Sequence, residues 1–165
     1  MACVFGVHNL EEGLGAARML EVLRNRGPQA FRAFYSTIGS GQLRFGLVFL
    51  TLLGLLVAFA AGRKTSSTAW TLSMLVFGAV ITLNALAHIF LAFAVGGYVP
   101  GLATAVLACL PVSGGQLWRA YRQHWVPAAV GWTVAPLAVL VHGPVLFALL
   151  RGIGALYRIV SRAAA

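Results

Sequence analysis

Residues 43–61 read LRFGLVFLTLLGLLVAFAA, an apolar run that carries a single charge, Arg44, near its start. A transmembrane helix needs about 20 predominantly apolar residues, so this run is long enough to cross a bilayer. Gly62, Arg63 and Lys64 end the run with basic residues of the kind that flank membrane spans. This stretch predicts a helical integral membrane protein.

The composition extends that interpretation to the whole chain. Hydrophobic residues make up 60% of the sequence, charged residues only 9%, and the mean hydropathy is +0.88. Soluble domains carry about 25% charged residues, so most of this surface is not expected to face water. The 165 residues hold about five spans and no separate soluble domain. We therefore predict an all-α fold: one polytopic transmembrane helical bundle over residues 1–165, with interfacial helices.

Apolar runs and turn residues locate the spans. The first, from Met1 to about Leu23, is weak because polar and charged residues interrupt it. Residues 29–42 are expected to form an interfacial loop or a short helix at the lipid headgroups. Residues 65–68 are expected to form a polar turn. The other spans are expected at 43–61, 70–95, 102–118 with a kink at Pro111, and 126–150 with Pro136 and Pro144 inside it.

The charges are strongly unbalanced, with a net charge of +9. No basic face or stacking motif accompanies them, so nucleic acid is not expected as a partner, and membrane lipids are. No cleavable signal peptide is expected, because no charge precedes the first apolar stretch. Basic residues are enriched in cytoplasmic loops, which predicts an N-out, C-in orientation. Five spans place eight basic residues on the cytoplasmic side (Arg18, Arg24, Arg26, Arg32, Arg44, Arg151, Arg158, Arg162) and four outside (Arg63, Lys64, Arg119, Arg122).

Ionisable residues inside the predicted spans are the candidates for function, because they are costly in lipid. In the first span, His8, Glu11 and Glu12 have i, i+3 and i+4 spacing, which puts them on one helix face. Asn84 and His88 share a face of the third span in the same way. A further set is predicted to bind substrate: His142 beside Pro144, Thr104 and Tyr98.

Two chemistries fit this inventory. Helix bundles bind metals through inward-facing Glu and His, so His8, Glu11, Glu12 and His88 are candidate ligands for zinc, iron or manganese. Without a metal, a glutamate and a histidine can act as acid and base. The predicted catalytic residues are Glu11, Glu12, His8, His88 and Asn84 in either case, and the cofactor is either none or a divalent metal.

Each residue also has a purely structural interpretation. Glu11 and Glu12 can be the acids of a helix start at the headgroups, since acids favour helix N-termini. Asn84 can bridge helices, as amides do in membranes, and His88 can bond a backbone carbonyl. His142 can satisfy groups freed by Pro144.

The chain resembles the HXXEE family of small bacterial membrane proteins. The resemblance rests on three motifs: residues 8–12 (HNLEE), Asn84 with His88, and residues 98–102 (YVPGL) continuing through Thr104 to Pro111. It implies a bacterial inner-membrane protein whose shared site is formed by His8, Glu11, Glu12, Asn84 and His88, with the 100–101 helix start nearby. The family carries no general activity to transfer, and His142 lies outside the matched motifs.

Three functions remain open from the sequence. The first is an intramembrane enzyme that isomerises, cyclises or hydrolyses a hydrophobic small molecule such as an isoprenoid, polyketide or lipid. The second is a proton or metal-ion transporter that uses the same residues as a relay. The third is a non-catalytic membrane subunit. An enzyme needs an apolar pocket over the polar residues, and a transporter needs a polar path to both surfaces. The sequence leaves a homo-oligomer open.

Overall fold

The computed structural model describes residues 1–63 and 67–163, and all regular structure in those ranges is helical. The prediction of an all-α fold is confirmed. Lys64 and residues 65 and 66 of the turn predicted at 65–68 lie outside the described residues. The elements are α1 (Ala2–Leu14), α2 (Ala16–Asn25), α3 (Gln29–Tyr35), α4 (Ser40–Arg63), α5 (Thr68–Val95), α6 (Leu102–Thr104), η1 (Ala105–Cys109), α7 (Leu110–Arg122), α8 (Ala128–Gly131), α9 (Val134–Leu140), η2 (Val141–Val145) and α10 (Leu146–Ala163).

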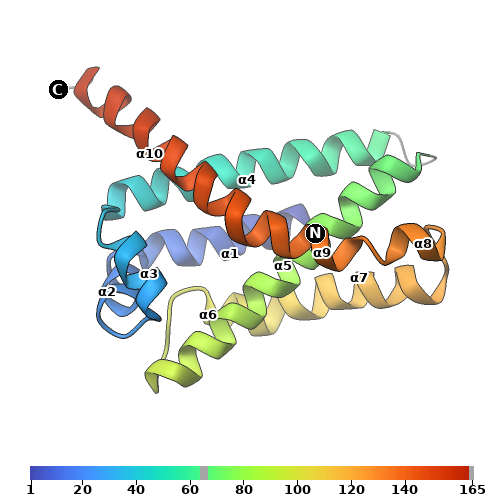
Figure 1. The fold of residues 1–165 in the computed structure, drawn as a ribbon, viewed down its shortest axis with the longest axis horizontal. Helices are drawn as coiled ribbons and strands as arrows, with labels where there is room; N and C mark the ends of the chain where they lie inside the picture. The colour runs from blue at the N-terminus through green and yellow to red at the C-terminus, as the bar shows by residue number, and fades with distance from the viewer. Residues whose placement is uncertain (64–66, 164–165) are drawn as a thin grey trace.

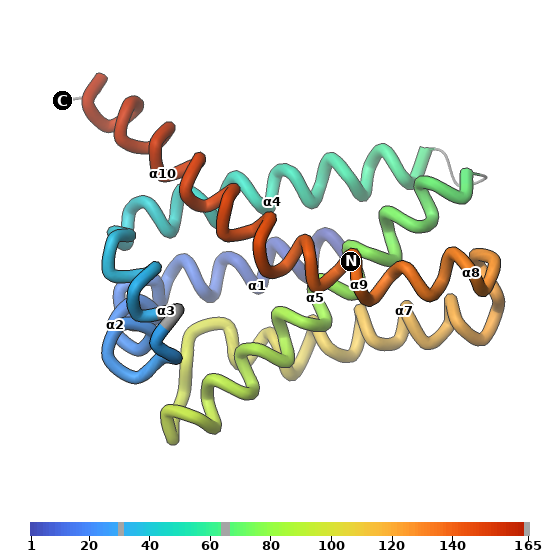
Figure 2. Tube along the Cα trace, in the orientation of Figure 1, coloured from blue at the N-terminus to red at the C-terminus, as the bar shows by residue number. Residues whose placement is uncertain are grey.

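The chain runs back and forth along the bundle (Figure 1). Helices α1, α4, α5, α7 and the arm formed by α9 and α10 alternate in direction, and α10 crosses in front of the others before its end leaves the bundle. The tube view shows the short α2–α3 unit and the 96–101 connection together at one end (Figure 2). In the view of Figure 1, α10 and α9 lie in front of α1 and α5, the two helices that carry most of the candidate site.

Within residues 1–63 and 67–163, three helical segments are long and apolar enough to cross a membrane: Ser40–Arg63, Thr68–Val95 and Ala128–Ala163. They coincide with the second, third and fifth predicted spans. Their length and composition indicate an integral membrane protein. Five spans are not confirmed, because α1 has 13 residues and reaches only about 20 Å at 1.5 Å per residue. The predicted fourth span does form a helical stretch from Leu102 to Arg122, but it is not among the three.

Glycine and proline explain where these segments change course. Gly96 ends α5 in the left-handed conformation, at φ 67°. Pro111 follows the π-helical turn η1, and Pro144 lies inside the π-helical turn η2. Proline lacks the N–H needed for the regular α-helical bond, so a widened turn accommodates it without breaking the helix. The expected kink at Pro111 takes this form, and the helix continues to Arg122.

The buried core surrounds the site. One hydrophobic group joins Ile81 and Ala85 of α5 to Ala105 and Cys109 of η1, and Val4 and Phe5 of α1 pack against it. A second joins Met19 and Leu23 of α2 to Leu91 and Val99. These contacts fix α1 against α5 and against the helix that begins at Leu102.

Candidate functional site

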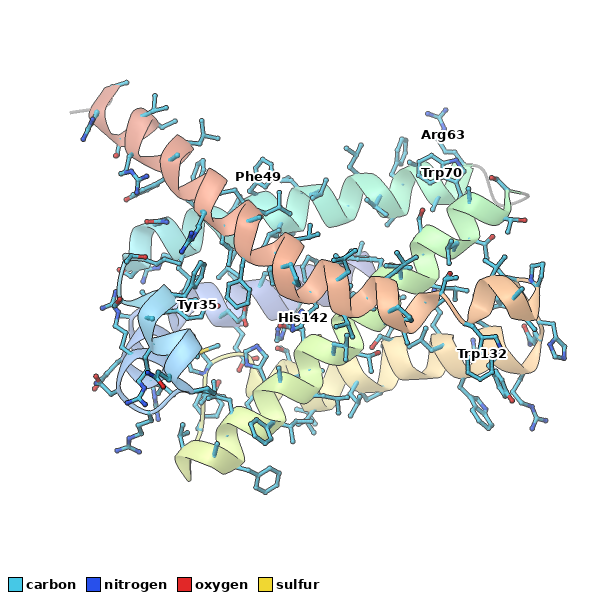
Figure 3. All side chains as sticks on the ribbon, in the orientation of Figure 1. Tyr35, Phe49, Arg63, Trp70, Trp132 and His142 are labelled. Carbon is cyan, nitrogen blue, oxygen red and sulfur yellow. The ribbon has the colours of Figure 1, made fainter. Side chains whose placement is uncertain are left out.

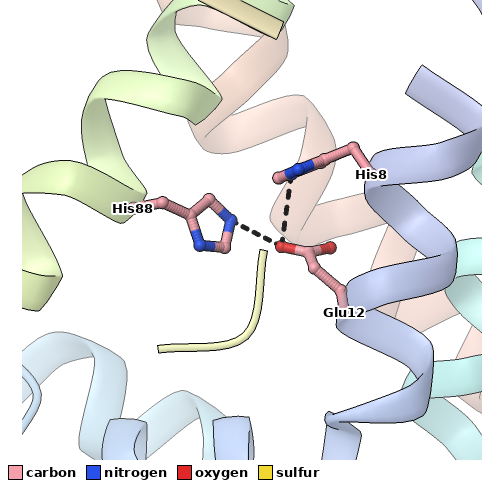
Figure 4. Close-up of side chains that lie close together, drawn as sticks. All are labelled: His8, Glu12 and His88. Carbon is pink, nitrogen blue, oxygen red and sulfur yellow. Dashed lines mark ion pairs between the residues drawn. The ribbon is translucent and has the colours of Figure 1, made fainter. Parts of the chain in front are cut away.

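Three ionisable side chains meet where α1 faces α5 (Figure 4). We call His8, Glu12 and His88 the His–Glu cluster. Oε1 of Glu12 lies 2.6 Å from Nε2 of His88 and 3.6 Å from Nε2 of His8. The two imidazole rings meet edge to face, with centroids 4.9 Å apart. The side chains of His8, Glu12 and His88 are only 1%, 12% and 4% exposed, so the cluster is buried among helices.

Two polar neighbours hold the His8 ring from both sides. Asn84 Nδ2 lies 2.7 Å from His8 Nε2, and Thr104 Oγ1 lies 2.8 Å from His8 Nδ1. The Thr104 hydroxyl also donates to Glu11 Oε2 at 2.6 Å. A hydroxyl has one proton, so while it donates to Glu11 it accepts the proton of His8 Nδ1. This arrangement leaves the lone pair of His8 Nε2 on the side of Asn84 and Glu12.

Glu11 has different contacts from Glu12, although the two are adjacent. Its carboxylate accepts bonds from the backbone N–H groups of Gly101, Ala103 and Thr104 at 3.0, 3.3 and 2.8 Å. It also accepts bonds from the hydroxyls of Thr104 and Tyr98. These donors all belong to residues 98–104, which we call the 98–104 connection. Glu11 therefore ties that connection to α1 and caps the helix that starts at Leu102.

Gly101 lets the 98–104 connection close over the cluster. Its φ is 90°, a left-handed conformation that residues with a Cβ rarely adopt. A Cβ at this position would also lie 2.6 Å from Cε1 of His88 and 3.0 Å from Cγ of Glu12. Both the conformation and the close approach require glycine here.

The cluster borders an apolar cavity of about 490 Å³. Side chains from α4, α5 and the α9–α10 arm form most of its wall, including Leu47, Val57, Val80 and Leu149. The polar residues on the wall are Asn9, Glu12, Tyr35, Ser73, Asn84 and His142. Figure 3 shows His142 near the middle of the bundle, well away from Trp70 and Trp132 at one end. Glu12 is thus the member of the His–Glu cluster whose side chain borders the cavity.

Two tyrosines outside the apolar spans are affected by the same carboxylates. Burial, together with the negative charge of Glu12, raises the pKa of Tyr35 to about 12. The hydrogen bond to Glu11 raises the pKa of Tyr98, with a further contribution from burial. Both effects favour the protonated phenol.

The structure brings the residues predicted from sequence into one region. His8, Glu12 and His88 are in contact, Asn84 and Thr104 hold His8, and Glu11 and Tyr98 are bonded to each other. His142 lines the cavity beside the cluster but is not bonded to it. The catalytic, substrate-binding and metal-binding roles of these residues stay predictions.

The role of Asn9 and the close contact of Gly101 with His88 were not predicted from the sequence, although the 100–101 helix start was expected near the site. Asn9 is buried and donates to Thr51 Oγ1 at 2.8 Å and to the Leu47 carbonyl at 3.3 Å, which joins α1 to α4. Its place beside His8 in a polar pentapeptide was the available signal. Gly101 followed a proline, a pattern that indicates a turn but not a close contact with His88.

This architecture defines a class: a helical membrane protein with a buried histidine–glutamate site between its first helix and an apolar span. The model of the family described as "Protein of unknown function with HXXEE motif" matches residues 1–114, and the chain belongs to this HXXEE family. The match covers the His–Glu cluster, Glu11 and the 98–104 connection, and confirms the resemblance seen in the sequence. Comparisons with curated proteins and with solved structures find no match.

Proposed function

We propose that the chain is an intramembrane enzyme that transforms a hydrophobic small molecule by acid–base chemistry at Glu12. One observation carries this proposal: the carboxylate of Glu12 both contacts His88 and borders the apolar cavity. A carboxylate beside an apolar cavity is an acid or base that a bound molecule can reach. A glutamate that served only to join helices would need no such access.

The cavity supports a hydrophobic substrate. Its volume of about 490 Å³ falls within the range of about 300–1,000 Å³ found for small-molecule sites. The wall is mainly Leu, Val and Phe side chains, with few polar groups. An isoprenoid, polyketide or lipid-like molecule fits this chemistry.

Proton transfer is the simplest reaction that these groups support. The Glu12 carboxylate takes a proton from one carbon or oxygen of the substrate and returns it at another, which isomerises or cyclises the molecule. His88 holds the carboxylate through the 2.6 Å contact, and His142 offers a polar group on the cavity wall. Glu11 acts as a positioning residue in this scheme, because its oxygens already accept bonds from the 98–104 connection.

The proposal includes the topology of the chain. Five crossings of the bacterial inner membrane, with the N-terminus outside and the C-terminus inside, use α1 with α2 and residues 102–122 as the two less apolar crossings. The alternating direction of the helices supports this arrangement (Figure 1). Helices α1 and α2 pack against α4, and residues 102–122 pack against α5, so both segments need less apolar surface of their own.

The test is to incubate the protein in nanodiscs with extracted bacterial lipids and to compare the products by mass spectrometry. We expect a product with the wild type that is lost in Glu12→Gln and reduced in Val80→Phe, which fills the cavity. The matched controls are Glu21→Gln on exposed α2 and Val48→Phe on the exposed face of α4, and both should keep the product. Full turnover by Glu12→Gln would overturn the proposal.

A further inference from the structure

The geometry points to a divalent transition-metal site formed by His8 Nε2, Glu12 Oε1 and His88 Nε2, with the amide oxygen of Asn84 as a fourth ligand. The inference deepens the proposed function, because the ion would lie at the same carboxylate and would act as a Lewis acid on the bound molecule. The sequence predicted His8, Glu11, Glu12 and His88 as ligands, and the structure favours Asn84 in place of Glu11.

Possible ligand atoms of His8, Glu12 and His88 converge on one point. One atom from each residue of the His–Glu cluster lies within 4.8 Å of the other two. Two imidazoles and one carboxylate are a set that zinc, iron and manganese accept, and a buried site screens them from competing water. His8 and Glu12 come from successive turns of α1, and His88 comes from the facing helix, so the three approach from two sides.

Hydrogen bonds on the far side of the His8 ring fix its orientation. The ring is held through Nδ1 by the Thr104 hydroxyl at 2.8 Å, and that hydroxyl is bonded to the Glu11 carboxylate at 2.6 Å. Metal-binding histidines generally donate their other N–H to such a partner, which fixes the ring and directs its lone pair at the ion. His8 therefore has its Nε2 lone pair directed at the centre of the cluster before any ion binds.

Asn84 lies where a fourth ligand would be. Its amide Nδ2 lies 2.7 Å from His8 Nε2, so a small outward shift brings the amide to the separation of about 3.3 Å expected for two ligands on a tetrahedral ion. The amide donates its N–H when the site holds only protons. A rotation of the Asn84 amide by about 180° around χ2 places Oδ1 beside the lone pair of His8 Nε2, and a cation between the two stabilises this arrangement. Asn84 also lines the cavity, so it links the ion to the space where a substrate would bind.

Metal binding takes the place of a hydrogen bond. Glu12 Oε1 and His88 Nε2 lie 2.6 Å apart, and both atoms can bind the ion only when no proton lies between them. The ion displaces that proton and moves the two atoms apart to about 3.3 Å, the separation of two ligands on a tetrahedral ion. Glu11 stays outside the set, since both of its oxygens accept bonds from the 98–104 connection.

The experiment measures metal content in detergent by mass spectrometry, using a tag without histidine. We expect about one zinc, iron or manganese ion per wild-type chain, and one cobalt ion, with visible absorption bands, after chelation and reloading. His88→Gln and Glu12→Gln should lose the ion. The controls His124→Gln and Glu21→Gln, at exposed positions, should keep it.

Two milder variants keep the test decisive if the first pair fails to fold. Thr104→Val should weaken cobalt affinity about 10–100-fold, while Thr104→Ser should retain it. Asn84→Asp should bind cobalt at least as tightly as the wild type. A metal-free wild type that does not take up cobalt, or equal metal content in wild type and His88→Gln, would overturn the site. If the metal-free protein turns over substrate, the proposed role of the metal is wrong and the proposed enzyme function stands. If the metal-loaded protein shows no turnover, the metal site stands and the proposed enzyme function is wrong.

Discussion

Two adjacent glutamates take on different work in this chain. Glu12 faces His88 and the cavity, whereas Glu11 accepts bonds from the 98–104 connection. Sequence spacing places both on one side of α1 and does not separate them. The difference arises from a chain segment about 90 residues away, as the Gly101 bond to Glu11 shows.

This difference predicts opposite effects of the same substitution on stability. Glu11→Gln places an amide N–H against backbone donors, and each lost bond to a charged group costs about 1.5–3 kcal/mol. Its thermal unfolding midpoint should fall clearly. Glu12→Gln keeps an oxygen for His88 and removes a buried charge, so its midpoint should hold or rise. Equal losses in the two variants, measured in detergent beside Glu21→Gln, would show that the two carboxylates share one structural role.

Gly101 gives a second prediction. Gly101→Ala should destabilise the protein by more than about 1–2 kcal/mol, because it adds left-handed strain to a clash with His88. Gly97→Ala, just before the 98–104 connection, is the matched control, since a Cβ there meets nothing within 4 Å. Unfolding midpoints of the two variants test this, and similar values would mean that the connection does not press on His88.

Tyr98 gives a prediction for high pH. Its pKa is raised above the ordinary value of about 10 by the bond to Glu11, so the phenol is protonated more readily in the folded state. Its contribution to stability is therefore complete below pH 10 and is lost as the pH rises through the folded pKa. The difference in unfolding midpoint between wild type and Tyr98→Phe should shrink above pH 10, and a constant difference would contradict the bond.

At the scale of the elements, the apolar helices were predictable and the polar ones were not. Helices α4 and α5 agree with the predicted spans to within a few residues, because hydropathy decides them. The first span is split at Gly15, where a Cβ would lie 2.5 Å from Pro100. That break depends on a distant contact, which no local pattern contains.

In the candidate site too, contacts within one helix were predictable and contacts between helices were not. Helical spacing was enough to pair His8 with Glu12 and Asn84 with His88, since each pair shares a helix. The approach of α1 to α5 depends on the 98–104 connection that Glu11 ties down, and on Asn9 joining α1 to α4. The spacing of the motifs does not predict these contacts. Thr104 was therefore predicted only as a substrate contact, and its hydrogen bond to His8 was not predicted.

At the scale of the whole molecule, the charge pattern and the fold agree on the two ends of the bundle. The α2–α3 unit lies at one end, with Arg18, Arg24 and Arg26 on α2 and the turn that follows it. Figure 3 places Arg63, Trp70 and Trp132 at the other end. Tryptophan gathers at membrane interfaces, and arginine-rich ends favour the cytoplasm. We therefore expect the two ends of the bundle to lie at the two membrane surfaces.

The number of crossings decides the final prediction. If only α4, α5 and the Ala128–Ala163 segment cross, and the basic α2 end is cytoplasmic, the chain returns to the cytoplasm after α5 and leaves it once more, so the C-terminus lies outside. If residues 102–122 also cross, the 123–127 loop lies outside and the C-terminus lies inside. We predict the second arrangement, because it keeps Arg151, Arg158 and Arg162 in the cytoplasm, as the distribution of basic residues requires.

A reporter active only in the periplasm should be active when inserted at Gln123 and inactive at the C-terminus. Insertion after Arg63 should be active under either arrangement and serves as the control. An active C-terminal reporter with an inactive one at Gln123 would show that residues 102–122 enter the bundle without crossing the membrane.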